Sequence, residues 1–137
     1  MTKTMRLRAL TSAVALAICA ASVVAANAYD LNAFRAAHGR PALRVNSSLT
    51  VLAHAHAQDM ARRGSLDHNG FFQNRGPNGA RAENVAYGCG DMACTIRQWS
   101  RSAGHRTNML RRDVHGYGIA SAVSSKGRRY WSLELGR

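Results

Sequence analysis

Hydrophobic residues recur at helical spacing in two segments of the first half of the chain. Residues 30–37 carry a short apolar face, and the glycine and proline that follow end this first helix. A second helix is predicted after an extended link; Asn46 or Ser47 caps it and Gly64 stops it. Its apolar face consists of Leu49, Leu52, Ala53, His56, Ala57 and Met60. Both helices are therefore expected to pack one face against a core.

The middle of the chain is more polar and richer in glycine. Residues 65–81 are predicted to form a loop anchored by its two adjacent phenylalanines. Residues 83–87 are expected to form a helical turn. A further helix is predicted over residues 92–100, and a turn with a short helix over residues 104–110.

Near the end of the chain the hydrophobic pattern changes to a period of two. Residues 117–123 and residues 130–135 alternate in this way, and the polar residues 124–127 between them supply a turn. This pattern predicts a β-hairpin. Helices first and strands last indicate an α+β fold, with helices packed on an antiparallel sheet.

The first 28 residues have the three parts of a secretion signal. Lys3, Arg6 and Arg8 precede a nearly uncharged stretch that is rich in alanine and valine. Small residues at positions 26 and 28 predict cleavage after Ala28, so that one domain, residues 29–137, is exported to the periplasm or the medium. The alternative is an uncleaved membrane anchor, which the short length and weak hydrophobicity of the stretch disfavour.

The exported domain is basic and has one pair of cysteines. The whole chain has a formal net charge of +12, and 16 basic and 7 acidic residues leave +9 after signal cleavage. This charge favours anionic partners such as cell-wall polymers or lipid head groups, or else it serves only solubility. No basic run is long enough to be a specific nucleic-acid motif. Because Cys19 falls in the signal, Cys89 and Cys94 are predicted to form a disulfide.

Three titratable residues lie in segments of the kind where binding residues tend to occur. His68 and His105 each stand among glycines and polar residues just beyond a predicted helix, and Glu83 follows a polar loop. A carboxylate at a helix start is the structural alternative for Glu83. His56 lies on the apolar face of the second helix, so we expect it to be a buried, hydrogen-bonded core residue rather than a ligand.

Two segments resemble the signatures of one protein family. Residues 82–88, Ala-Glu-Asn-Val-Ala-Tyr-Gly, are similar to a Gly-Glu-Asn-(Ile/Val) motif. Residues 99–110, Trp-Ser-Arg-Ser-Ala-Gly-His-Arg-Thr-Asn-Met-Leu, are similar to Trp-x-x-Ser-Pro-Gly-His-Arg-x-Asn-Ile-Leu. Both motifs are typical of the CAP family, which groups cysteine-rich secretory proteins, antigen 5 allergens and plant pathogenesis-related proteins with many small bacterial members. The resemblance covers nearly all of residues 29–137.

The resemblance implies an α-β-α sandwich with a small central antiparallel sheet and a cleft that holds two histidines and two acidic residues. His68 and His105 match the histidines, and Glu83 matches the glutamate of the Glu-Asn motif. The other acidic residue of the family follows the tryptophan, but residues 100–102 contain no carboxylate, so the set is incomplete. Histidines of this family bind zinc or another divalent metal. With only two protein ligands, His68 and His105, such a metal would be weakly bound.

The same resemblance suggests a role for each residue. Glu83 and His105 are the candidate catalytic groups, with Glu83 as a general acid or base or as the partner that orients a histidine. Asn84, Ser102 and Arg106 are candidates for polar contacts with a substrate. Arg106 is expected either to pair with Glu83, to hold an anionic substrate, or to form a structural salt bridge.

The expected function is that of an exported protein acting in the cell envelope. It would bind peptidoglycan, or cleave one of its glycan bonds, through the His/Glu cleft. Glycosidases usually use two carboxylates and only one candidate is found, so enzymatic activity stays open. The alternatives are a non-catalytic module for a lipid or small ligand and a host-directed interaction protein. We expect a monomer with no stable membrane anchor after signal cleavage.

Overall fold

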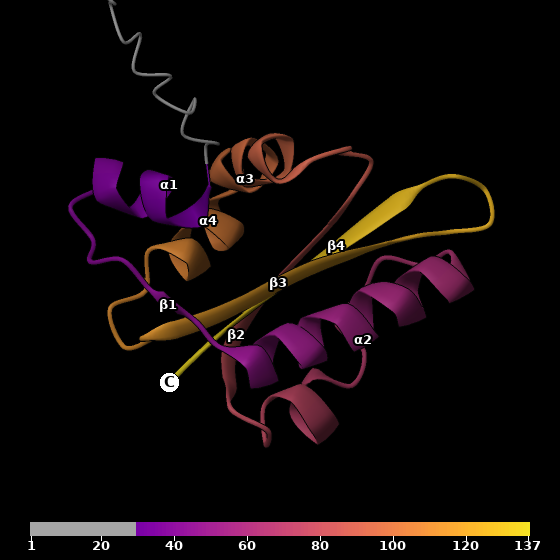
Figure 1. The fold of residues 1–137 in the computed structure, drawn as a ribbon, viewed down its shortest axis with the longest axis horizontal. Helices are drawn as coiled ribbons and strands as arrows, with labels where there is room; N and C mark the ends of the chain where they lie inside the picture. The colour runs from indigo at the N-terminus through magenta and orange to yellow at the C-terminus, as the bar shows by residue number, and fades with distance from the viewer. Residues whose placement is uncertain (1–29) are drawn as a thin grey trace, which may run out of the picture.

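The computed structural model describes residues 30–137; the predicted secretion signal, its cleavage site and Cys19 lie outside the described residues. A four-stranded sheet with the strand order β1-β3-β4-β2 lies between two layers of helices (Figure 1). Strands β2 and β3 run antiparallel to β4, and the short β1 runs parallel to β3. The strands are β1 (Arg44–Val45), β2 (Ala80–Tyr87), β3 (Gly116–Val123) and β4 (Arg129–Gly136).

The helices begin and end at residues whose side chains or backbone favour those ends. Asp30, Asn46 and Asp91 each accept a hydrogen bond from a backbone N–H in the first turn of the helix that follows. Gly64 ends the longest helix in the left-handed region, at φ 67°. The helices are α1 (Leu31–Ala37), α2 (Ser47–Arg63), α3 (Met92–Ser100) and α4 (Ala103–Met109), with a π-helical turn, η1 (Phe71–Arg75).

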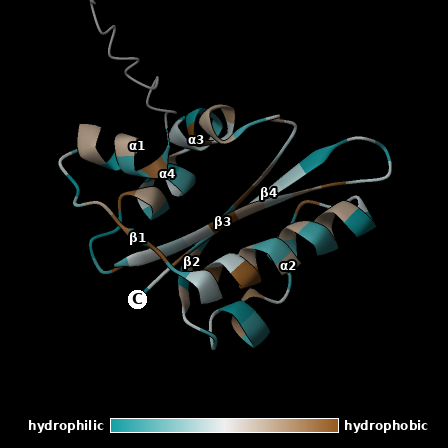
Figure 2. Cartoon of the chain, viewed as in Figure 1, coloured by the Kyte–Doolittle hydropathy of each residue, from teal (hydrophilic) through white to brown (hydrophobic). Residues whose placement is uncertain are grey.

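The sheet is covered on both faces, which confirms the predicted α+β sandwich. Helices α1, α3 and α4 pack on one face, around Phe34, Trp99 and Leu133. Helix α2 lies across the other face, where Met60 packs with Val85 and further apolar residues. The strands are brown along the middle of the sheet, and α2 is mixed teal and brown, as expected for a helix with one buried face (Figure 2).

The structure corrects two predictions for the middle of the chain. Residues 83–87 form the second half of strand β2, not a helical turn, because β2 pairs with β4 along its length. The expected loop over residues 65–81 contains η1 and the start of β2. Phe71 is partly buried, but Phe72 is 82% exposed, so the two phenylalanines do not both anchor this segment as predicted.

The remaining helices and the C-terminal hairpin occur as predicted. Residues 117–123 and 130–135 fall within β3 and β4, which pair as a hairpin. Among the described helices, none has the length and hydrophobicity needed to cross a membrane.

Candidate functional site

Glu83 lies at the centre of a buried network of charged side chains. Its carboxylate comes from the middle of β2 and faces α2, and its side chain is only 2% exposed. Oε2 pairs with Nε of Arg75, and Oε1 accepts a hydrogen bond from Nη2 of Arg75 at 3.1 Å. Nδ1 of His68 lies 2.6 Å from Oε1, and Nε2 of His56 lies 3.6 Å from it. Glu83 is therefore held from three sides.

Arg75 is the residue that ties this network to the chain before β2. Its guanidinium also donates to the backbone carbonyls of His68 (3.2 Å) and Asn69 (3.0 Å). The buried side chain of Arg75 therefore has two effects. It holds the backbone of the segment that carries His68, and it neutralises the Glu83 carboxylate, which orients the His68 ring. Sequence reasoning missed Arg75, because an arginine in a glycine-rich loop carries no periodic signal.

A second buried carboxyl group, that of Glu134, lies beside Glu83. The two residues are directly opposite in the pairing of β2 and β4, so their side chains share the face toward α2. Oε1 of Glu134 accepts from the Ser132 hydroxyl at 3.0 Å and lies 3.3 Å from Nε of Arg75. Oε2 is buried, and no N–H or O–H donor of the described residues reaches it. A proton on Glu134 would satisfy this oxygen by a hydrogen bond to Glu83.

The pKa values of the pair are pushed apart by their surroundings. Burial raises the pKa of Glu134 to about 9, and its hydrogen bond to Glu83 and the charge of Glu83 act in the same direction. Burial also disfavours ionised Glu83, but hydrogen bonds from His68, Glu134 and Arg75 outweigh it and hold the pKa of Glu83 well below its usual range. At neutral pH the pair therefore carries one negative charge, which Arg75 balances.

Glu134 was missed as a site residue from sequence. The family resemblance places the second acidic residue just after Trp99, where residues 100–102 have none, and β4 supplies a second buried carboxyl group instead. A signal was present: Glu134 stands between Leu133 and Leu135 in an alternating strand, where a charged residue on a covered face needs a partner.

His68, Glu83, His105 and Ser102 line one open cleft of about 530 Å³ at the edge of β2. The side chain of His68 is 54% exposed, and His105 is half-buried on α4. The hydrogen bond that His68 donates to Glu83 raises the pKa of His68 against the effect of burial. Burial lowers the pKa of His105, and the charge of His68 lowers it further. We call His68 and His105 the cleft histidines.

Comparison with known proteins agrees with this fold. The model of the cysteine-rich secretory protein family, CAP, matches residues 28–135. The chain belongs to the CAP family. A search of curated proteins gives no match to it.

Two solved structures share the CAP fold of this chain. An outer surface protein from Borrelia burgdorferi is 13% identical over 78% of this chain and 86% of its own, with a TM-score of 0.65. An extracellular protein containing a SCP domain, from Bacillus anthracis, is 24% identical over 76% of this chain, with a TM-score of 0.55. The match covers 37% of the Bacillus chain, so it concerns one part of a longer protein. At these identities the likeness shows the fold alone.

Asn84 and Arg106 of this CAP domain lie differently from the other predicted site residues. Asn84 is fully buried on the face of β2 opposite to Glu83, where its Nδ2 donates to the backbone carbonyl of His105 at 3.0 Å. Asn108 donates to Oδ1 of Asn84 at 3.0 Å, which fastens α4 to β2. Arg106 is exposed and donates to the carbonyl of Ser100 at 3.3 Å, and the partner of Glu83 is Arg75 instead.

The donor set of the cleft does not fit a tightly held metal ion. Within residues 30–137, no three His, Cys, Asp or Glu side chains are grouped to hold one. His68 uses Nδ1 for Glu83, which leaves Nε2 and the ring of His105 as donors. Glu83 is occupied by Arg75, whose positive charge also opposes a cation nearby. Weak binding of a divalent metal ion, with zinc as the favoured candidate, stays a prediction.

The predicted disulfide between Cys89 and Cys94 is present in the CAP domain. Its Cα atoms lie 5.6 Å apart, within the usual range for a disulfide. It joins the segment after β2 to the first turn of α3, and the indole N–H of Trp131 donates to the Cys89 carbonyl at 2.9 Å. The disulfide therefore fixes how the chain leaves the strand that carries Glu83.

Proposed function

We propose that this CAP domain is exported and binds a glycan of the cell envelope in the cleft between His68 and His105, without hydrolysing it. The observation that carries the proposal is the state of Glu83. Its carboxylate is 2% exposed, ion-paired with Arg75 and hydrogen-bonded to His68, so it serves to hold the cleft together. What the cleft offers a ligand is therefore imidazole, hydroxyl and amide groups.

The positions of the two carboxyl groups argue against glycoside hydrolysis. Most glycosidases place one carboxyl group on each side of the scissile bond, with a general acid in reach of the leaving oxygen. Here both lie on the same side, against Arg75, and Glu134 is completely buried. Glu83 stays ionised and so does not supply a proton, whereas Glu134 is protonated but shut off from the cleft.

Glycan binding matches the chemistry of the cleft lining. Ser102, Thr107 and Asn108 also line the cleft. Thr107 and Asn108 donate their hydrogens within the protein, so their side-chain oxygens are left to accept, whereas the Ser102 hydroxyl and the imidazole rings can donate as well as accept. Sugar hydroxyl groups need such mixed partners, and an open cleft admits a polymer that continues past it. The net charge of +9 would attract an anionic polymer to this surface.

Export of the domain is supported by the predicted signal and by the relatives. The solved structures that share the fold are described as an outer surface protein and an extracellular protein. Residues 1–28 have the pattern of a secretion signal. Together they support a location in the periplasm or outside the cell.

Co-sedimentation with purified peptidoglycan sacculi tests the binding site. We expect the wild-type protein to sediment with sacculi and a His68→Ala/His105→Ala variant to remain in solution. The matched control is His38→Ala/His54→Ala, which removes two exposed histidines that do not line the cleft. Equal sedimentation of all three proteins would overturn the cleft as the site.

Chromatography of the soluble fraction tests the absence of hydrolysis. After long incubation with sacculi, no muropeptide or glycan fragment should be released above a protein-free control. Release of fragments by the wild type would show an enzyme and contradict the assigned state of Glu83.

A lipid-binding module is the second candidate, and one observation favours it. Phe72 is 82% exposed at the surface of η1, and its ring packs edge-on against Phe71 with the centroids 5.3 Å apart. An exposed aromatic ring of this kind is often used at a lipid or protein contact. Lipid extraction of the purified protein followed by mass spectrometry, with Phe72→Ser as the comparison, tests it; an extract without lipid would count against it.

A further inference from the structure

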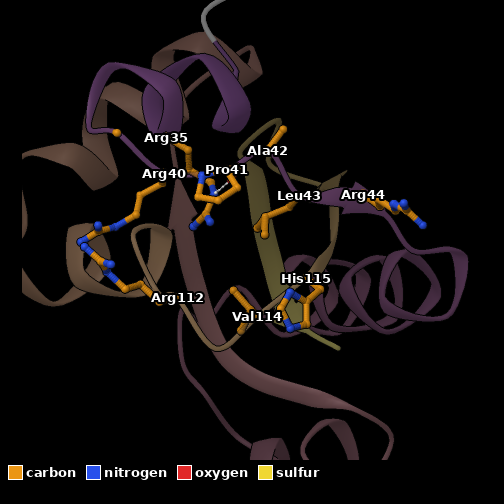
Figure 3. A pocket seen from close by; sticks show the side chains of 10 residues that line it. Arg35, Arg40, Pro41, Ala42, Leu43, Arg44, Arg112, Val114 and His115 are labelled. Atoms are coloured by element: carbon orange, nitrogen blue, oxygen red, sulfur yellow. Dashed lines mark hydrogen bonds between the residues drawn. The ribbon is translucent and has the colours of Figure 1, made fainter.

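A second pocket, of about 500 Å³, lies at the opposite edge of the sheet from the glycan cleft. It is enclosed by the chain between α1 and β1 and by the residues just before β3 (Figure 3). The strand order places β1 and β2 at opposite edges, and the two sites share no residue. We call this second site the arginine pocket. Its charged and titratable lining residues are Arg35, Arg40, Arg44, Arg112 and His115.

The arginine pocket holds an excess of positive charge. No aspartate or glutamate lines it, and among the described residues none of its four arginines forms an ion pair. The nearby Asp113 is taken by Arg111, whose Nη2 lies 2.6 Å from it and which does not line the pocket. The guanidinium groups of Arg35, Arg40 and Arg112 therefore lie at this pocket without a counter-ion from the described residues.

Arg35 gives this pocket a built, buried cationic group. It is 1% exposed, and its hydrogen bonds go only to backbone carbonyls: Pro41 at 2.9 Å, Met109 at 2.7 Å and Arg111 at 3.0 Å. Carbonyl dipoles satisfy its N–H groups but do not neutralise its charge, and a buried charge without a counter-charge is costly. Burial and the charge of Arg40 both lower the pKa of Arg35, as expected for crowded cations.

Two arginines at the mouth are placed to receive an anion. Figure 3 shows the side chains of Arg40 and Arg112 reaching the same side of the pocket, whereas Arg44 extends away from it. Arg40 is fixed by a hydrogen bond from Nε to the Leu110 carbonyl at 3.0 Å, and Arg112 is exposed. Like charges on one side are unfavourable unless a shared anion lies between them.

We propose that the arginine pocket binds a phosphate group. Guanidinium groups form paired hydrogen bonds to phosphate oxygens, and several of them suit a group that carries more than one negative charge. The apolar wall formed by Leu43 and Val114 keeps water from part of the pocket and strengthens the attraction. The phosphate can belong to an anionic polymer, to a lipid head group or to a free ion. This site is independent of the proposed glycan cleft.

Titration of the purified protein with inorganic pyrophosphate at fixed ionic strength tests the proposal. Isothermal calorimetry should show saturable binding to the wild type. The Arg40→Gln/Arg112→Gln variant should bind about tenfold more weakly or worse, since it loses charge-assisted hydrogen bonds. The matched control, Arg81→Gln/Lys126→Gln, removes the same charge from exposed residues outside the pocket and should change affinity less than about twofold.

Two results would overturn the proposal. One is the absence of saturable binding to the wild type. The other is an equal loss in the pocket variant and the charge control, which would show general attraction to a basic protein. A single Arg112→Gln variant separates loss of binding from misfolding, because no side-chain hydrogen bond of Arg112 is found in the described structure. This variant should bind pyrophosphate clearly more weakly while keeping the wild-type melting temperature.

Further arms of the same experiment identify the source of the phosphate. Sedimentation with phosphatidylglycerol vesicles, with phosphatidylcholine vesicles as the blank, tests a lipid head group. Competition of pyrophosphate binding by soluble poly(glycerol phosphate) tests a polymer. If vesicle binding or polymer competition is lost in the Arg40→Gln/Arg112→Gln variant, the result supports the site and identifies the lipid or the polymer as the source of the phosphate. Binding of pyrophosphate alone supports a site for a free ion.

Discussion

Glu134→Gln is expected to leave the CAP domain folded and to make it more stable than the wild type as the pH rises. Glu134 is completely buried, and its pKa is raised from 4.5 to about 9 in the fold. At neutral pH the side chain is therefore a neutral carboxyl group that donates to Glu83. A glutamine amide has nearly the same shape and also donates a hydrogen bond, so near pH 5 the change should be within about 1 kcal/mol.

The magnitude follows from the difference in bound protons. Between pH 4.5 and about 9 the folded wild type holds the proton of Glu134, whereas the unfolded chain has lost it. The raised pKa therefore makes the free energy of unfolding of the wild type fall with pH, by up to about 1.4 kcal/mol per pH unit. Glutamine does not titrate, so the variant lacks this fall. The free energy of unfolding of the variant, relative to that of the wild type, should therefore rise by up to the same amount per pH unit.

Urea unfolding of both proteins at pH 5, 6, 7, 8 and 9 measures this difference directly. Glu83→Gln is the matched control, because it changes the neighbouring carboxyl group in the same way but removes the ionised partner of Arg75. That variant should be destabilised at pH 7 by about 3 kcal/mol or more, as expected when a buried ion pair loses one member. A difference between Glu134→Gln and the wild type that stays constant from pH 5 to 9 would refute the assigned protonation state.

Three further predictions concern the metal, the disulfide and the glycines. Zinc titration followed by calorimetry should show weak binding that is lost when both cleft histidines are replaced by alanine. Reduction of Cys89–Cys94 should lower the free energy of unfolding by about 2 kcal/mol, because the closed loop is short; urea unfolding with and without reductant measures it. Gly118→Ala should prevent or severely weaken folding, since the new Cβ would lie 2.1 Å from the backbone nitrogen of Thr50. Gly104→Ala, on open helix surface, should raise the melting temperature.

The helices could be predicted from sequence because their signals are local. Asp30 and Asn46 cap helices within three residues of their own positions, and Gly64 ends α2 by its own backbone conformation. The role of His56 was also predictable: it is 4% exposed, and its Nε2 contacts the Asp67 carbonyl at 2.9 Å. The helix ends depend on the residue itself and on its near neighbours along the chain, and the burial of His56 follows from its place on the apolar face of α2.

Strand β2 and its partners were not predictable in the same way. Its residues are buried on both faces, so Glu83 and Asn84 interrupt the apolar run without producing an alternation. Glu134 and Arg75 acquire their roles only when β4 pairs with β2 and η1 folds over the pair, and these contacts join segments far apart in sequence. The family resemblance located Glu83, but it did not reveal that the carboxylate is held by Arg75 and His68 and is therefore not available for catalysis.

The Glu-Asn dipeptide of β2 explains how one strand positions both cleft histidines. Neighbouring residues of a strand point to opposite faces, so Glu83 reaches the side of α2 and Asn84 the side of α4. Glu83 fixes the ring of His68, while Asn84 holds the backbone of His105. Because β2 is an edge strand, both histidines meet at the rim of the sheet, where a ligand has access. The two residues thus act mainly as positioning residues: each is buried, and each holds one cleft histidine in place.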